Sequence, residues 1–307
     1  MIDILLATYN GEAWLEEQID SLLAQEFRDW RLLARDDGSS DRTVELLQSY
    51  ANRFPGKIVI LSNHGDNLGP CGNFTKLLEF SNADYVMFCD QDDIWLPDKI
   101  GVTLVKMQEM EAAHGLATPF LVHTDFKLVD EKLQVFAESG WQYQKTEPKR
   151  MALNRLLVQN VATGCTVMIN RTLREIARPI PPGALMHDWW LALVASVFGK
   201  IGQLAQPTML YRQHAANKVG AQNWNAAYIL GLVSQLSLIR AVMARNRTQA
   251  RAFYECYQAS LGKREKALLE AFFLMPERGM LRRRFDICRY HIFYGGFVRN
   301  LGWLVLC

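Results

Sequence analysis

The first hundred residues alternate four times between a short apolar run and a helical pattern, and this order constrains the fold more than any other feature. The apolar runs span residues 2–7, 30–34, 57–61 and 84–89. The segment between the first two runs places Leu15, Ile19 and Leu22 on one helical face. Alternating strands and helices are typical of a parallel sheet covered by helices, whose ligands bind beyond the carboxyl ends of the strands. The sequence therefore predicts an α/β fold with its site at that edge of the sheet.

An acidic loop, Asp90-Gln91-Asp92-Asp93, directly follows the fourth apolar run. Like charges this close raise one another's pKa unless a cation neutralises them, and carboxylate oxygens suit Mg²⁺ or Mn²⁺. Mg²⁺ in proteins is usually bound by one or two carboxylates together with the phosphates of a substrate. The loop therefore predicts a nucleotide or diphosphate ligand. The glycine-rich sequences that bind dinucleotides or P-loop phosphates are missing from the strand ends. An ordinary solvated turn is the alternative interpretation of the acidic loop.

Composition indicates a globular protein that remains inside the cell. Half of the 307 residues are apolar and 21% are charged, which excludes an intrinsically disordered chain. The six cysteines form no C-x-x-C pair, as expected for reduced thiols in a cytoplasmic protein. The first dozen residues enter a strand and a turn without the basic and apolar regions of a secretory signal, so we expect a cytoplasmic location.

Seven short motifs mark the ends of the predicted elements. In chain order they are Ala7-Thr8-Tyr9-Asn10, Asp36-Asp37-Gly38-Ser39-Ser40-Asp41, Asn67-Leu68-Gly69, Asp90-Gln91-Asp92-Asp93-Ile94-Trp95, Thr163-Gly164-Cys165, His187-Asp188-Trp189-Trp190 and Tyr211-Arg212-Gln213-His214. Together they closely resemble the motifs of the inverting family 2 glycosyltransferases of GT-A fold. The resemblance covers residues 1–220 and implies a Rossmann-like, mostly parallel sheet flanked by helices. The fourth and seventh motifs look most like those of bacterial rhamnosyltransferases that build surface polysaccharides.

This resemblance implies a pocket for a nucleoside diphosphate sugar, either a dTDP-sugar or a UDP-sugar. The implied donor-binding residues are Ala7, Thr8, Tyr9, Asp36, Asp37, Asn67, Gly69, Asp90, Gln91 and Arg212. Tyr9 would stack on the base, and a carboxylate of Asp36 or Asp37 would accept the imide N–H of uracil or thymine. The alternatives are a solvated turn for the two aspartates and a core-edge aromatic for Tyr9.

The resemblance also implies a metal site and a catalytic base. Asp92, together with Asp90 and His214, would hold Mg²⁺ or Mn²⁺ against the two phosphates of the donor. Asp188 occupies the position of the family's base, which removes the proton of the acceptor hydroxyl. The alternatives are a helix N-cap for Asp188 and a purely structural role for His214. Asp93 is expected to cap the loop or the next helix and has no predicted catalytic role.

The chain divides electrostatically near residue 220. Residues 1–220, with a net charge of −6, are predicted to be a GT-A catalytic domain, in which 1–125 bind the nucleotide sugar and 126–220 face the acceptor. Residues 221–307, with a net charge of +8, are predicted to be a basic amphipathic helical region. Its basic residues are interleaved with Phe285, Tyr290, Ile292, Phe293, Tyr294, Phe297, Trp303 and Leu304. This composition is typical of a helix lying on an anionic membrane surface, and the last apolar stretch is too short to span a bilayer.

A homodimer interface is the alternative use of that basic region, whereas nucleic acid is not an expected partner because no recognised binding module accompanies the basic residues. The sequence thus predicts a metal-dependent inverting glycosyltransferase. By resemblance, it would transfer L-rhamnose from dTDP-rhamnose to a lipid-linked glycan in O-antigen or capsule synthesis, peripherally on the inner face of the cell membrane. Two rival hypotheses remain: a phosphohydrolase that uses Asp90 as its nucleophile, and a non-catalytic scaffold that binds sugar nucleotides.

Overall fold

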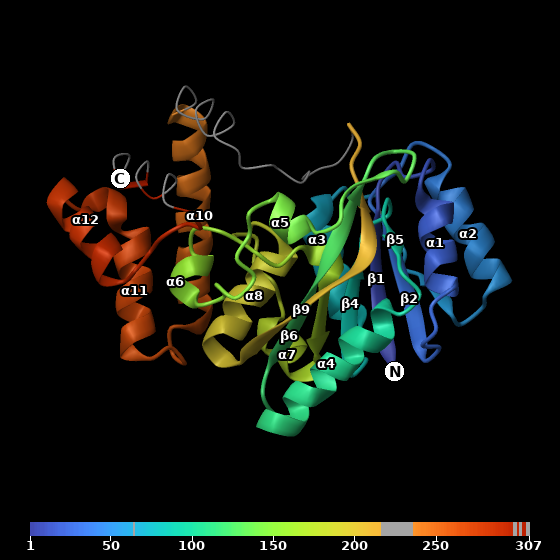
Figure 1. The fold of residues 1–307 in the computed structure, drawn as a ribbon, viewed down its shortest axis with the longest axis horizontal. Helices are drawn as coiled ribbons and strands as arrows, with labels where there is room; N and C mark the ends of the chain where they lie inside the picture. Colours follow the sequence, from blue (N-terminus) through green and yellow to red (C-terminus); the bar gives the residue numbers. More distant parts are fainter. Residues whose placement is uncertain (64, 216–235, 297–299, 301–302, 305–307) are drawn as a thin grey trace.

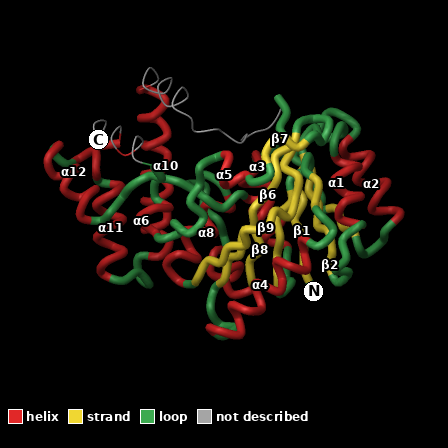
Figure 2. The backbone as a smooth tube through the Cα atoms, in the orientation of Figure 1, coloured by secondary structure: helices red, strands yellow, loops and turns green. Residues whose placement is uncertain are grey.

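The computed structural model describes residues 1–63, 65–215, 236–296, 300 and 303–304, and its centre is one sheet flanked by helices (Figure 1). The strands are β1 (Ile2–Thr8), β2 (Trp30–Asp36), β3 (Ile58–Ile60), β4 (Tyr85–Cys89), β5 (Ile94–Trp95), β6 (Phe120–Val129), β7 (Val135–Ala137), β8 (Val167–Asn170) and β9 (Lys200–Arg212). They gather in one sheet, drawn in yellow in Figure 2, and are ordered β3-β2-β1-β4-β8-β6-β9-β5, with β7 paired to β6.

The pairing confirms a mostly parallel sheet. Strand β1 runs parallel to both β2 and β4, and β2 runs parallel to β3. Strand β8 is antiparallel to β4 and to β6, so β6 has the direction of β4, and β9 is parallel to β6. The last residue of β1, Thr8, is paired with Asp36, the last residue of β2. The loops that follow β1, β2 and β4 therefore meet at one edge of the sheet, where the site was predicted.

Helices cover both faces of the sheet, which explains why its strands read as continuous apolar runs rather than alternating ones. Along β1, Ile4 and Leu6 join one buried cluster while Leu5 joins the other. The helices are α1 (Leu15–Leu23), α2 (Thr43–Arg53), α3 (Gly69–Phe80), α4 (Lys99–His114), α5 (Gly140–Tyr143), α6 (Leu153–Leu156), α7 (Arg171–Ala177), α8 (His187–Phe198), α10 (Leu236–Tyr257), α11 (Lys263–Phe273) and α12 (Met280–Arg289). The predicted face of α1 is confirmed, since Leu15, Ile19 and Leu22 are fully buried.

The C-terminal helices α10, α11 and α12 lie at the end of the molecule opposite α1 and α2 (Figure 1). This confirms the predicted helical character of the region. Trp190 of α8 packs edge-on against Phe253 of α10, with ring centroids 5.5 Å apart, and both belong to one buried cluster. The proposed domain boundary at residue 220 stays a prediction, because residues 216–235 lie outside the described part of the chain, as does Phe297. Among the described residues, no helix combines the length and apolarity needed to cross a membrane.

Candidate active site

The side chain of Gln91 joins the loop after β4 to the loop after β1, an arrangement called here the Gln91 clamp. Its Oε1 accepts the backbone N–H of Tyr9 at 2.8 Å, and its Nε2 donates to the carbonyl of Tyr9 at 3.0 Å. Gly11 leaves room for the clamp, because a Cβ atom there would lie 2.4 Å from Cδ of Gln91. Tyr9 is 51% exposed, so it is not a core-edge residue, and its stacking on a base stays a prediction. A direct donor contact by Gln91 stays a prediction.

Asp36 and Asp37 are buried, which excludes the solvated-turn interpretation. The carboxylate of Asp36 accepts hydrogen bonds from the Thr8 hydroxyl at 2.9 Å and from the backbone N–H of Ser39 at 2.7 Å. Asp37 accepts hydrogen bonds from the Arg35 guanidinium at 2.9 Å and from the backbone N–H of Gly69 at 2.7 Å. These bonds fix the loop after β2 and the start of α3. Recognition of a pyrimidine base by either carboxylate stays a prediction.

Three further donor-binding candidates line the same edge. Gly69 begins α3 with a φ of 68°, a left-handed conformation that favours glycine. Exposed Asn67 accepts the backbone N–H of Gly69 through its Oδ1 at 3.3 Å, and Ala7 is half-buried in β1. The structure therefore places all three at the predicted edge. Their contacts with a donor stay predictions.

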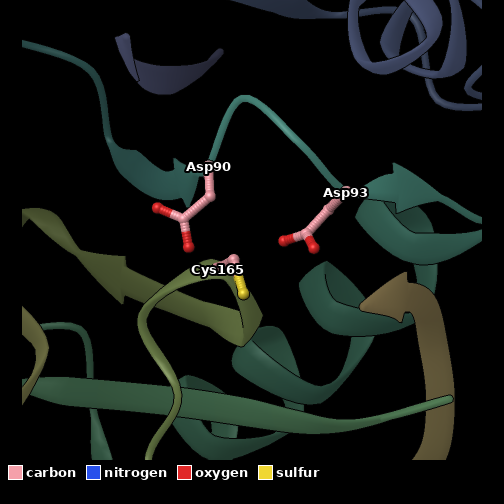
Figure 3. A group of neighbouring side chains, drawn as sticks. All are labelled: Asp90, Asp93 and Cys165. Carbon is pink, nitrogen blue, oxygen red and sulfur yellow. The ribbon is translucent and has the colours of Figure 1, made fainter. Parts of the chain in front are cut away.

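Asp90, Asp93 and Cys165 face one another below the acidic loop (Figure 3). One carboxylate oxygen from each aspartate and the sulfur of Cys165 all lie within 4.8 Å of one another. Asp93 is fully buried; its Oδ1 accepts the backbone N–H of Arg212 at 3.2 Å, whereas its Oδ2 accepts no hydrogen bond from the described residues. Burial, together with the charges of Asp92 and Asp90, raises the pKa of Asp93. The sequence did not predict that Cys165 lies beside Asp90 and Asp93, although Thr163-Gly164-Cys165 is one of the seven motifs.

The side chains of Asp92 and His214 meet although they are 122 residues apart in the chain. Oδ2 of Asp92 and Nε2 of His214 are 2.9 Å apart, and both side chains are largely buried. The His214 ring stacks on Trp14, with centroids 5.2 Å apart and planes 26° apart. The structure thus brings together two of the three predicted metal ligands. Trp14 was missed because nothing in its local sequence links it to residue 214.

Arg212 supports the acidic loop from within the protein. Its Nε donates to the carbonyl of Asp92 at 2.9 Å, and its Nη1 donates to the carbonyl of Glu131 at 3.0 Å. Its Nη2 pairs with the carboxylate of Glu17, and its guanidinium lies 4.5 Å from the centroid of the Trp14 ring. Arg212 is 1% exposed, so in this conformation it holds the acidic loop in place. The predicted contact with the donor diphosphate stays a prediction.

Asp188 lies in the first turn of α8, whose N-cap residue is Met186, so the N-cap interpretation of Asp188 is wrong. Its Oδ1 accepts the backbone N–H of Trp189 at 2.7 Å, and its Oδ2 accepts the Asn160 side-chain amide at 3.1 Å. Burial raises the pKa of Asp188 to about 6, an effect that these hydrogen bonds oppose. A carboxylate with this pKa is ionised at neutral pH and is basic enough to accept a proton. Asn160 was not found by sequence reasoning.

Asp188 and Asp90 both lie near the short segment Gly164–Cys165. A Cβ atom on Gly164 would lie 3.6 Å from Cβ of Asp188, and the sulfur of Cys165 lies within 4.8 Å of an Asp90 oxygen. Burial raises the pKa of Asp90 to about 7, and the charges of Asp92 and Asp188 contribute. The acidic loop and the start of α8 therefore form one negatively charged site.

The carboxylate oxygens of Asp90 and Asp92 are ligands of the kind that Mg²⁺ and Mn²⁺ prefer. Among the described residues, however, the group whose donor atoms come within 4.8 Å of one another is Asp90, Asp93 and Cys165, so the set Asp90, Asp92 and His214 stays a prediction. The charge of Asp92 raises the pKa of Asp90, so a cation between them would relieve their repulsion.

Comparison with known proteins identifies the family of the chain. The family model "Glycosyl transferase family 2" matches residues 3–176. The dTDP-rhamnosyl transferase RfbG of Shigella flexneri is 31% identical over 241 residues, which cover 74% of this chain and 78% of RfbG.

Two solved structures share the fold. TarS 1–349 of S. aureus in complex with UDP-GlcNAc superposes with a TM-score of 0.59 at 14% identity, covering 94% of this chain and 80% of TarS. The mannosyltransferase PcManGT of Pyrobaculum calidifontis in complex with GDP-Man and Mn²⁺ has a TM-score of 0.51 at 14% identity, covering 99% and 86%. The family model matches more than half of the chain, and RfbG is 31% identical over 74% of the chain. The protein therefore belongs to glycosyl transferase family 2 and is a glycosyltransferase.

Proposed function

We propose that the protein is a metal-dependent inverting glycosyltransferase of surface polysaccharide synthesis. It transfers a sugar from a nucleoside diphosphate donor to a lipid-linked glycan, and dTDP-rhamnose is the favoured donor. The proximity of Asp188 to Asp90, whose pKa the Asp188 charge helps to raise, and of both residues to Gly164–Cys165 carries the proposal. Displacement at an anomeric carbon needs a base on one side of the sugar and charge stabilisation on the other. Asp188 is proposed for the first role and a cation held at the acidic loop for the second.

Asp188 is the proposed base. Its carboxylate takes the proton of the acceptor hydroxyl, while Asn160 and the N–H of Trp189 hold it in a fixed orientation. Asp90, Asp92 and His214 would hold the cation, which would supply Lewis-acid stabilisation of the negative charge on the leaving phosphate. Arg212 keeps the acidic loop in position through the carbonyl of Asp92.

The donor proposal rests on two observations. The exposed ring of Tyr9 and the buried pair Asp36 and Asp37 lie together at the ends of β1 and β2, where a pyrimidine base could stack and form a hydrogen bond. The name of RfbG states dTDP-rhamnosyl transfer, and the complexes of TarS and PcManGT contain nucleotide sugars. Because uracil and thymine offer the same imide N–H, the preference for a dTDP-sugar over a UDP-sugar rests on RfbG alone.

Activity is expected to depend on the ionisation of Asp188. Because its pKa is raised to about 6, the base is protonated and inactive at lower pH and ionised above it. We expect kcat/KM to rise about tenfold per pH unit below pH 6 and to level off above it, as for a single essential base. Initial rates at saturating Mn²⁺ measure this profile. A rate that is already constant from pH 5 upwards would contradict the assignment.

Trp14 is expected to act as a positioning residue for the metal site. Replacing it with leucine removes the ring on which His214 stacks and which Arg212 covers. We expect the Mn²⁺ concentration for half-maximal activity to rise about tenfold, in the range found for residues that orient metal ligands, with a smaller change in kcat. Trp14→Phe should restore most of the Mn²⁺ affinity because it keeps an aromatic face. A lower melting temperature with unchanged Mn²⁺ dependence would indicate a purely structural role.

The donor assignment is tested by thermal-shift measurements with dTDP, UDP and GDP sugars in the presence of Mn²⁺, followed by transfer assays with a lipid-linked acceptor. We expect dTDP-rhamnose to give the largest stabilisation and transfer with inversion. A phosphorylated Asp90 after incubation with donor alone would instead support the phosphohydrolase. Tight donor binding without transfer or hydrolysis across a broad acceptor panel would support the non-catalytic scaffold.

A further inference from the structure

The outer face of α12 carries large apolar side chains in contact with solvent. Met280 is 57% exposed, Leu281 is 80% exposed and Phe285 is 51% exposed. Leu281 and Phe285 are four residues apart and therefore lie one turn apart on the same face. Ile287, in contrast, is fully buried in the cluster that contains Trp190. The helix thus packs one face on the protein and presents an apolar strip, Met280, Leu281 and Phe285, to the outside.

Arginine side chains surround this apolar strip. The guanidinium groups of Arg282 and Arg289 lie 5.5 Å and 5.8 Å from the centroid of the Phe285 ring. Residues 278–289 contain five arginines and one acidic residue, Asp286. Asp286 is buried and pairs with Arg278 and Arg282, so it does not offer a negative charge to a partner. The exposed face of α12 is therefore apolar and carries a net positive charge from Arg282 and Arg289, although Arg282 also pairs with Asp286.

This combination distinguishes between possible partners. A second copy of the chain, related by a two-fold axis, would bring the same arginines against one another and would be opposed by their charge. A nucleic acid would satisfy the arginines but would leave the exposed Leu281 and Phe285 in water. An anionic bilayer satisfies both, because apolar side chains enter the boundary with the acyl chains while arginines contact the headgroups.

The structure leaves fewer residues available for the membrane contact than the composition of residues 221–307 predicted. Ile292 and Trp303 are buried, and Tyr290, Phe293, Tyr294 and Leu304 pack against the buried cluster. Of the described aromatic and aliphatic residues named for this region, only Phe285 points largely to solvent. The candidate contact is therefore one helical strip and not the whole region.

We propose that the strip Met280, Leu281 and Phe285, with Arg282 and Arg289, docks the enzyme on an anionic lipid surface. The inference deepens the proposed function, because it brings the enzyme to the layer in which a lipid-linked acceptor resides. It requires no membrane-spanning helix. Binding weakens with salt, since part of it comes from charge.

The test is co-sedimentation of the full chain with phosphatidylcholine vesicles and with mixed phosphatidylglycerol–phosphatidylcholine vesicles. We expect binding to the mixed vesicles to be at least about tenfold stronger. The double variant Leu281→Ser/Phe285→Ser is expected to lose about tenfold or more of this binding, because it removes the apolar insertion. The matched control, Val105→Ser/Leu116→Ser, removes two equally exposed apolar side chains on and just after α4 and should bind as the wild type does.

Equal binding to both kinds of vesicle, or undiminished binding by the α12 double variant, would overturn the proposal. Light scattering that shows an oligomer in the wild type and its loss in the double variant would assign the strip to a protein contact instead. If circular dichroism shows that the double variant does not fold, vesicle binding is measured for Arg289→Gln and for the wild type at increasing salt. Weaker binding in both measurements supports the proposal, and unchanged binding in both overturns it. Hydrolysis or transfer of the donor to a soluble acceptor analogue is measured in parallel. Retained turnover with lost vesicle binding separates this inference from the proposed function.

Discussion

Asp188→Asn is expected to lower kcat about 10³-fold, within the range that a general base contributes. The asparagine keeps the size of the side chain and can still accept the Trp189 N–H, but it cannot take a proton from the acceptor hydroxyl. The KM for the donor should change little, because Asp188 is proposed to act on the acceptor side of the sugar. Steady-state rates against donor and acceptor concentration give both parameters.

Asp98→Asn is the matched control, because Asp98 is half-buried and bonds Gln206 at the start of α4, apart from the loops of the site. It should retain turnover within about twofold, as expected for a substitution outside the site. The Asp188→Asn variant should also lose the acidic limb of the pH profile. Turnover close to that of the wild type would remove Asp188 from the mechanism, and a large loss in the control would assign the effect to folding.

Asp92→Asn is expected to abolish most metal-dependent activity, with kcat/KM lower by about 10²–10³-fold, since a Lewis-acid ion supplies several kcal/mol of charge stabilisation. The substitution removes the negative charge of the proposed ligand, while His214 and Trp14 can keep their stacking. Calorimetric titration with Mn²⁺ in the presence of a nucleoside diphosphate should show weaker binding. Chelation should inactivate the wild type, and added Mn²⁺ should restore it.

The Asp98→Asn protein again serves as the control, with Mn²⁺ binding equal to that of the wild type. Equal Mn²⁺ affinity and equal chelator sensitivity in the Asp92→Asn and wild-type proteins would show that the cation, if required, binds elsewhere. The cluster of Asp90, Asp93 and Cys165 would then be the next candidate, because its donor atoms already lie within 4.8 Å of one another.

The fold was predictable because its signal is local. Buried strands and amphipathic helices are recorded in short windows of sequence, and the alternation of four such pairs indicates a parallel sheet. The position of the acidic loop was equally predictable, since it follows directly after β4. Contacts between segments that are distant in the sequence could not be predicted. Trp14 and His214 are two hundred residues apart, and only the course of β9 beside β6 and β5 brings them together.

Residue type alone also does not predict which partners a side chain contacts or whether it is buried. Asp36 and Asp37 were recognisable as an acidic pair at a strand end, but their hydrogen bonds to loop amides depend on how the loop folds. Similarly, composition marked residues 285–304 as apolar and basic without separating the two faces of each segment. Packing sends Ile292 and Trp303 inward and leaves Phe285 outside.

The Gln91 clamp has a thermodynamic consequence. One amide side chain connects the backbone of Tyr9, where a base would stack, to the loop that carries Asp90 and Asp92. If the clamp couples the binding of nucleotide and cation, reciprocity requires each to change the affinity for the other by the same factor. A chain with the clamp cut, as in Gln91→Ala, would lose cooperativity between its two ligands.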